Sequence, residues 1–485
     1  MAFGAPLWRG RWKGTSTDFF GGEFLPRLVW PPRLPPRDLV LNATNTPAQQ
    51  REILKLVHDS TSLLEIRECL IPADDGRLHP ALDAETAIDC VCYLTSNIND
   101  GFLSMIDNSA TVLDHVVKTV VESLDVAELR STEKAQLVWI METVEREQRQ
   151  RLTGGEPRWT LHAMKAIAER QTQLERQASL PMPTPGHAAN GAEAISTYAT
   201  KDLVNLTISI SNTRLFASSA PVVRFLLLVL DELMSRIAKP HIRSAFAIRE
   251  LSLLAAAVAT AFETVPATSV EARGAYEGFL MRLWADGMKP KVANRHSSTS
   301  GKSCFEDLKR YLFAYLRVFA EEPPERMLEG ISSYVTRLLR SGLESDAAVE
   351  LTGTFSDLAA LLEFFAYYAS RSGPSLPSIS VIELVSVVGA CMRQLTLVKF
   401  ETEVEMNDTN DTNDANDDVV AMDAIASLLD SHVRLKLRPA EETLLALVPY
   451  VRTLYRNKQD PAALTSILGS FEAFGFDPGR SLTSL

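Results

Sequence analysis

One short segment carries residues of the kind that hold phosphate groups. Ser300-Gly301-Lys302-Ser303 matches the end of a phosphate-binding loop, in which backbone amides and a lysine contact the phosphates. That loop also requires a glycine at position 296 and a strand before it. Position 296 is His296, and no strand pattern precedes it. The sequence therefore predicts no nucleotide site here.

Other chemical patterns are also incomplete. The Asn/Asp-rich run 407–418 resembles a calcium loop but lacks the central glycine and the terminal glutamate. Cys90-Val-Cys92 has no second pair at zinc-finger spacing, and the five scattered cysteines indicate buried thiols in a reducing compartment. No His pair flanks an acid at i, i+4, and no Gly-x-Ser-x-Gly turn occurs. We predict a protein that is not an enzyme and has no cofactor, metal or small-molecule substrate.

The acidic charge of the chain is concentrated in one segment. The net charge is −12, and residues 401–430 hold ten acids without any Lys or Arg. Removing those ten charges leaves −2 for the rest of the chain. The overall charge therefore does not exclude a polyanionic partner, which needs clustered Lys and Arg.

The N-terminus has a different composition. Residues 1–37 contain six Arg or Lys, two acids and several aromatic residues, but no apolar core of a secretory signal. We interpret residues 1–46 as a basic tail. It is either an organellar presequence or a disordered tail that contacts a partner. The apolar runs 222–230 and 251–262 are too short to cross a bilayer, so no membrane insertion is expected.

From residue 47 onward, apolar residues recur at the spacing of amphipathic helices, and strand-like alternation is scarce. The fold class predicted is all-α. Helices are expected around 53–66, 112–121, 132–150, 160–180, 200–216, 221–238, 247–264, 270–286, 304–320, 325–341, 355–370, 378–398, 420–437, 440–456 and 461–474.

Composition divides the chain into regions. A helical region at 47–180 precedes a Pro/Gly/Ala-rich linker at 181–197, and a polar, basic, Ser-rich loop is expected at 288–303. A helical array at 198–400 is followed by an acidic low-complexity insertion at 401–419, which we expect to be disordered. C-terminal helical repeats occupy 420–485.

The helices after the linker share a local pattern. Acids at 202, 250, 307 and 357 recur every 48 to 57 residues, each followed by a leucine-rich stretch. We interpret each acid as a first-turn residue at a helix N-terminus with a Ser or Thr cap. Paired antiparallel helices at this interval predict an α-solenoid. The alternative is a plain helical bundle whose helices share capping chemistry.

The C-terminal stretches 422–430, 438–447 and 460–478 sharpen this pattern, with a Leu-rich helix that ends in Ala473-Phe474-Gly475. This resembles the helical repeats of organellar heptatricopeptide, octotricopeptide and FAST-kinase-like proteins, over residues 198–480. The resemblance implies an α-solenoid that binds mitochondrial or plastid RNA and supports RNA processing, RNA stability or ribosome assembly.

Three segments are rich in Lys and Arg: 201–249, 282–317 and 431–458. The candidate RNA-binding residues are Arg236, Lys239, Arg243, Arg249, Lys289, Lys291, Arg295, Lys302, Lys309, Arg310, Arg434, Lys436 and Arg438. Nearby tyrosines that could stack on bases are Tyr311, Tyr315, Tyr450 and Tyr455. The alternative is solvated cations and core tyrosines.

Together these features predict a non-enzymatic helical-repeat protein that binds single-stranded RNA in mitochondria, or otherwise in the cytoplasm. Protein partners are also compatible with the pattern. The alternative function is an armadillo- or HEAT-like protein–protein scaffold.

Overall fold

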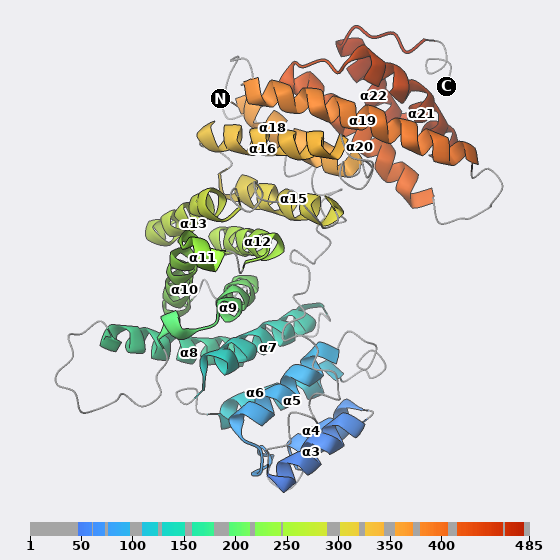
Figure 1. The fold of residues 1–485 in the computed structure, drawn as a ribbon. Coiled ribbons are helices and arrows are strands. Elements are labelled where there is room, and N and C mark those ends of the chain that lie inside the picture. The colour runs from blue at the N-terminus through green and yellow to red at the C-terminus, as the bar shows by residue number, and fades with distance from the viewer. Residues whose placement is uncertain are drawn as a thin grey trace. The chain divides into compact units, whose positions relative to one another are not determined.

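The computed structural model is all-α: every regular element in the described part of the chain is a helix, and none is a strand (Figure 1). The structure describes residues 47–60, 62–72, 76–97, 109–124, 129–150, 158–178, 194–213, 219–243, 246–288, 301–319, 325–343, 355–371, 379–405, 415–458 and 461–479. The predicted basic tail at 1–46 therefore lies outside the described residues. So does the predicted linker at 181–197, except for its last four residues, 194–197.

The chain divides into two compact units. Unit 1 comprises Met1–Phe246 and Ala256–Leu283, and unit 2 comprises Ala247–Ala255 and Trp284–Leu485. The boundary crosses helix α12 (Ile248–Thr264) and falls within the π-helix η5 (Leu283–Met288). Both sides of the predicted linker at 181–197 belong to unit 1, so the linker does not separate the units.

In unit 1 the helices form two rows. The A row consists of α3 (Ala48–Asp59), α5 (Ala84–Asn97), α7 (Ser131–Gln150) and α9 (Thr200–Asn212). The B row consists of α4 (Leu63–Leu70), α6 (Ser109–Ser123), α8 (Arg158–Ala178), α10 (Ala220–Ala238) and α13 (Val270–Arg282). Each helix packs against the next helix of its own row. The short turns η3 (Ile195–Thr197) and α11 (Pro240–Arg243) flank α9 and α10 in sequence.

Unit 2 repeats this arrangement. Its A row consists of α15 (Gly301–Val318), α18 (Phe355–Arg371), α20 (Ala415–Leu435) and α22 (Pro461–Ala473). Its B row consists of α16 (Glu325–Leu343), α19 (Ile379–Glu405) and α21 (Glu441–Lys458). Within each row, successive helices again pack against one another.

Local chemistry accounts for several helix ends. Ser62 and Glu65 form a reciprocal capping box at the start of α4, with both hydrogen bonds 3.2 Å long. At the end of α22, Gly475 has φ +65° and its N–H donates to the Glu472 carbonyl, while the Phe476 N–H donates to the Phe471 carbonyl. This is a Schellman motif, which needs a left-handed residue. The predicted small-aromatic-Gly turn is therefore present.

The helix predictions are largely confirmed, with local differences. The stripe at 53–66 is divided between α3 and α4, and α5 was not predicted. Helix α15 begins at Gly301, inside the range predicted for a loop. Helix α19 continues to Glu405 and α20 begins at Ala415, so helix enters the predicted acidic insertion from both sides. Residues 406–414 lie outside the described residues.

Helix α19 contains a stretch that the sequence analysis did not single out. Ile379–Leu397 is the one segment among the described helices that is long and apolar enough to cross a membrane, and 56% of its most apolar window is buried inside the protein. The helix packs against both α16 and α21. This burial between neighbours explains its apolar composition without a bilayer.

Candidate functional site

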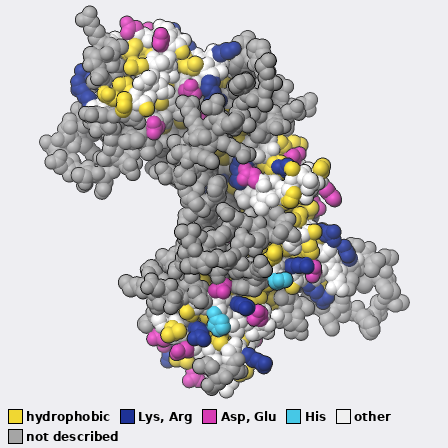
Figure 2. All heavy atoms as spheres, turned by 180° about the vertical axis from the view of Figure 1, so that it is seen from behind, with side chains coloured by type: hydrophobic (Ala, Val, Ile, Leu, Met, Phe, Trp, Pro, Cys, Tyr) yellow, Lys and Arg dark blue, Asp and Glu magenta, His cyan; other side chains and the backbone are white. Residues whose placement is uncertain are grey.

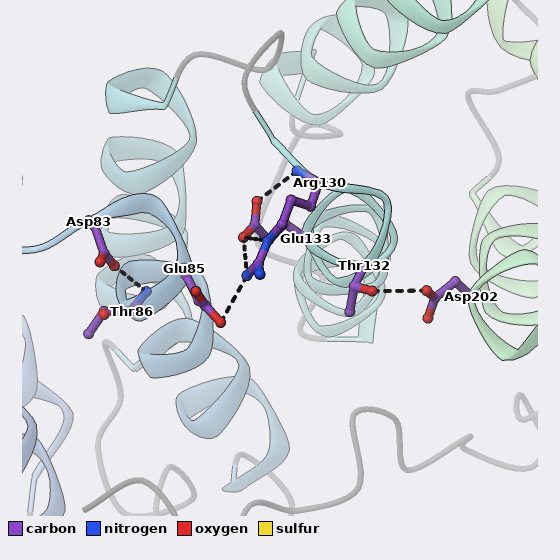
Figure 3. Close-up of polar contacts among 7 residues, drawn as sticks. All are labelled: Asp83, Glu85, Thr86, Arg130, Thr132, Glu133 and Asp202. Carbon is purple, nitrogen blue, oxygen red and sulfur yellow. Dashed lines mark hydrogen bonds and ion pairs between the residues drawn. The ribbon is translucent and has the colours of Figure 1, made fainter. Parts of the chain in front are cut away.

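Successive A-row helices of unit 1 are joined by polar side chains near their N-termini (Figure 3). Arg130, which directly precedes α7, places its Nη2 2.8 Å from Glu85 Oε1 of α5 and 2.6 Å from Glu133 Oε1 of α7. The Arg130 backbone N–H also donates to the Glu133 carboxylate over 2.8 Å. Asp83 caps α5 by accepting from the Thr86 N–H. One guanidinium therefore holds the starts of α5 and α7 together.

On its other side, α7 is joined to α9. The Thr132 hydroxyl donates to Asp202 Oδ2 over 3.1 Å, between residues 70 positions apart in the chain (Figure 3). Asp202 is 4% exposed. It is the first of the four acids that recur in the sequence, and its partner lies on the neighbouring A-row helix. The predicted Ser or Thr cap is absent here, because the N-cap of α9 is Ala199.

In unit 2 two further recurring acids have the same role. The Ser252 hydroxyl of α12 donates to Asp307 of α15 over 3.1 Å, and Lys309 Nζ of α15 lies 2.8 Å from Asp357 of α18. Ser252 and Lys309 each lie two residues after one recurring acid, and each contacts the next recurring acid. The recurring acids at 202, 307 and 357 are therefore inter-helix contacts.

The first-turn interpretation of Asp307 was wrong. Asp307 is the seventh residue of α15, beyond the first turn, because α15 begins at Gly301. Burial raises the pKa of its carboxyl group, and Arg310, 2.8 Å away, opposes that shift. Glu250 and Asp357 do lie in the first turns of α12 and α18.

Three candidate RNA-binding cations are bonded to other groups of the protein. Arg236 donates to Glu232, to the Thr200 hydroxyl and to the Ser196 carbonyl, and is 8% exposed. These groups line an open polar pocket of about 420 Å³. Lys309 and Arg310 are part-buried and pair with Asp357 and Asp307. Their charges are largely neutralised by protein groups.

The other candidates divide into two sets. Lys239, Arg249, Lys436 and Arg438 are exposed, and Arg434 lies 4.0 Å from Asp430. The side chains of Arg243 and Lys302 are not described, and Lys289, Lys291 and Arg295 lie outside the described residues. The structure thus does not bring the described candidates into one cluster.

The expectation that four tyrosines could stack on bases needs correction. Tyr311, Tyr315 and Tyr450 are 0% exposed. Their rings pack in the core, Tyr311 against Trp284, Tyr315 against Phe319 and Tyr450 against Phe355, with centroids 4.4–5.7 Å apart. Only Tyr455, which is half-buried on α21, retains an accessible ring among these four.

Sequence reasoning did not group together a set of arginines on the B row of unit 2, which we call the arginine row. Its members are Arg337 and Arg340 of α16, Arg393 of α19, and Arg452 and Arg456 of α21. Four are exposed and Arg452 is half-buried. Arg337, Arg340 and Arg393 lie outside the three basic segments, and the five arginines together span 120 residues of sequence. The packing of α16 against α19 and of α19 against α21 places the three helices that carry these arginines side by side.

On the face drawn in Figure 2, Lys and Arg side chains of the described residues lie in small groups, separated by acidic, hydrophobic and other side chains. That face therefore shows no continuous basic band among the described residues.

Within the described part of the chain, no group of three or more His, Cys, Asp or Glu side chains is arranged to hold a metal ion. Cys90, Cys92 and Cys391 are buried, and burial raises the pKa of all three thiols, that of Cys391 to about 12. Thiols with a raised pKa are poor nucleophiles and poor metal ligands.

Comparison with known proteins places the chain in no family: no family model, curated protein or solved structure matches it.

Proposed function

We propose that each unit is a segment of an α-solenoid and that the protein is a non-enzymatic scaffold for single-stranded RNA. The observation that carries the proposal is a polar contact that recurs between neighbouring helices, from Thr132 of α7 to Asp202 of α9, Ser252 of α12 to Asp307 of α15, and Lys309 of α15 to Asp357 of α18. A plain bundle packs its helices around one core and has no reason to repeat one contact along a row. A solenoid repeats it because each repeat contacts only its neighbours.

The direction of the helices supports this reading of unit 2. Lys309 contacts Asp357, and Tyr315 contacts Phe364 further along both helices, so α15 and α18 run parallel. Parallel neighbours within a row are expected when each repeat is an antiparallel helix pair. Such rows present a long exposed surface made from equivalent positions of successive helices.

RNA is the partner that we propose because exposed cations remain after the internal ion pairs are accounted for. Lys239, Arg249, Lys436 and Arg438 are exposed, and much of the net negative charge comes from residues 401–430. The role in mitochondrial RNA processing, RNA stability or ribosome assembly is proposed on the sequence resemblance. Imaging of the full chain fused at its C-terminus to a fluorescent protein tests the location, and exclusion from mitochondria would contradict it.

The binding proposal is tested with the full-length protein and a labelled single-stranded RNA of mixed sequence. We expect binding at 50 mM salt that weakens steeply as salt rises, with a slope of about −0.7 per phosphate contact on a log–log plot. Absence of RNA retention at 20 mM salt would overturn the proposal.

A protein partner is the second candidate, and one observation favours it. Leu445 of α21 and Ile382 of the neighbouring α19 are 57% and 42% exposed. Protein-binding surfaces are typically contiguous exposed apolar patches, and a patch that joined these two side chains would be one. This alternative predicts a stoichiometric protein partner that co-purifies with the chain after complete nuclease digestion. Replacing the Leu445 side chain should abolish that co-purification.

A further inference from the structure

The arginine row has no protein counter-charge among the residues that the structure describes. None of its five guanidinium groups forms an ion pair there, and the Arg337 Nε contact is a long 3.3 Å bond to the Ser333 carbonyl. Two exposed lysines on B-row helices of unit 1 do pair with an acid one turn away. Lys118 lies 3.8 Å from Glu122, and Lys165 lies 3.7 Å from Glu169.

Among the described side chains of these helices, the exposed acids lie in the N-terminal halves: Glu329 of α16, Glu383 of α19, and Glu441 and Glu442 of α21. The side chains of the three glutamates in the last turns of α19 (Glu401, Glu403 and Glu405) are not described. The arginines follow them toward the C-terminal halves. Helix dipoles favour cations only within the last turn. Arg393 lies twelve residues before the end of α19, so the dipole does not account for its position.

The chemistry of the row suits phosphate groups. A guanidinium offers a planar fork of donors that binds phosphate oxygens in pairs, which the ammonium of lysine cannot do. Every described cationic side chain on α16, α19 and α21 is an arginine. Tyr455 lies between Arg452 and Arg456 in the sequence of α21 and is half-buried, so part of its side chain is accessible. It follows Arg452 by three residues, which places the two on the same side of the helix.

We propose that the arginine row binds the phosphate backbone of single-stranded RNA laid across α16, α19 and α21, with a base stacked on Tyr455. The inference rests on the proposed function for its partner and assigns that partner a surface. Neighbouring helix axes are about 8–10 Å apart. A flexible chain with a charge on every nucleotide can therefore meet cations on all three helices, and unpaired bases are free to stack.

The test uses the full-length protein with Arg337→Gln, Arg393→Gln and Arg456→Gln combined. Its matched control carries Arg176→Gln, Arg224→Gln and Arg282→Gln, which removes the same charge from exposed positions of unit 1. We expect the row variant to lose affinity on the order of 30-fold at 50 mM salt and its salt slope to become shallower by about 2. The control should stay within about threefold of the unsubstituted protein.

The outcomes separate the two proposals. If the unsubstituted protein does not bind RNA, the proposed function fails and this inference fails with it. If it binds RNA and the row variant matches the control, the inference alone is overturned. Equal competition by poly-glutamate of the same charge would also overturn it, because carboxylates would then satisfy the row as well as phosphates.

A second measurement does not depend on the folding of a variant. Ultraviolet cross-linking of RNA to the unsubstituted protein, read by mass spectrometry, should place a cross-link on the peptide that contains Tyr455. Cross-links confined to unit 1 would contradict the assignment. A variant with the same three arginines changed to lysine should bind with intermediate affinity, because charge remains while paired donation is lost.

Discussion

The ammonium group of Lys309 lies 2.8 Å from the carboxylate of Asp357, across 48 residues of sequence and between two neighbouring helices of one row. Only 12% and 9% of the two side chains is exposed. Lys309 had been a candidate for RNA binding, but in this position its charge stabilises the contact between α15 and α18. Their separation of 48 residues falls within the interval of 48 to 57 residues at which the acids recur in the sequence.

Replacing Lys309 with Met should lower the free energy of unfolding by about 3–5 kcal/mol, because the Asp357 carboxylate would remain buried without its partner. Lys309→Met together with Asp357→Leu should recover much of that loss. Urea denaturation measures both changes. The exposed Lys118→Met is the control and should cost less than about 1 kcal/mol. Equal losses for Lys309→Met and the control would show that the buried pair is not formed.

Lys436 and Gly475 occupy equivalent turns and offer a pair of opposite substitutions. Lys436 ends α20 with φ +57°, in the same Schellman geometry that Gly475 adopts after α22. Lys436→Gly should raise stability by about 1 kcal/mol, because glycine lacks the Cβ that disfavours this conformation. Gly475→Ala should lower it by a similar amount. Thermal unfolding reports both, and a loss of stability in Lys436→Gly would contradict the turn geometry.

His432 predicts a specific pH dependence. The imidazole is 0% exposed, its Nδ1 bonds to the Leu428 carbonyl over 2.8 Å, and its Nε2 has no partner. Burial lowers its pKa to about 4. Between pH 6.5 and 4 the unfolded chain therefore binds a proton that the folded chain does not. The free energy of unfolding should fall by about 3 kcal/mol over that window and stay constant above it.

The measurement compares His432→Leu with the unsubstituted protein from pH 4 to pH 8. Above about pH 6.5, the difference in free energy of unfolding between the two proteins should not change with pH. Below it, the variant should lose less stability than the unsubstituted protein. This comparison cancels other groups that titrate in the range, such as Asp89, whose pKa burial raises to about 6. Replacement of the exposed His115 controls for the removal of a histidine, and parallel pH profiles for His432→Leu and the unsubstituted protein would exclude the assigned shift.

Tyr311 and Tyr455 should respond oppositely to alanine substitution. Tyr311→Ala removes a ring that is 0% exposed and should cost about 3–5 kcal/mol of stability. Tyr455→Ala should leave stability nearly unchanged and weaken RNA binding about tenfold, in line with the loss of one stacked base. Thermal unfolding and RNA titration together read both effects. If the Tyr455→Ala variant binds RNA as well as the unsubstituted protein does, the ring is not part of the RNA-binding site.

The acidic stretch of the sequence should oppose RNA binding. Asp408, Asp411 and Asp414 follow Arg393 within 21 residues of chain. Changing all three to Asn should strengthen RNA binding about threefold at 50 mM salt, because fewer negative charges on the protein then repel phosphates, and the gain should disappear near 0.5 M salt. Fluorescence titration at both salt concentrations measures it. A gain that persists at high salt would show that the effect is not electrostatic.

Most of the helical architecture could be predicted from the sequence. Apolar spacing located nearly all helices from α7 to α22, because burial of one face imposes a 3.6-residue period that needs no knowledge of the partner. Helix α5 was missed, although the run Ile88, Val91 and Leu94 with its two cysteines carries the same period. The recurring acids at 202, 307 and 357 were also visible, but their partners were not.

The sequence alone determined that the chain is helical, where its helices lie, and that acids recur at a repeat-like interval. Which cations remain available to a partner was decided only by the tertiary structure. Lys309, Arg310 and Arg236 are neutralised by groups 3 to 48 residues away in the chain, whereas Arg337, Arg393 and Arg456 have no such neighbour among the described residues. The physical reason is that helical periodicity specifies the buried face of each helix, while the charge a side chain meets depends on which other helix packs beside it.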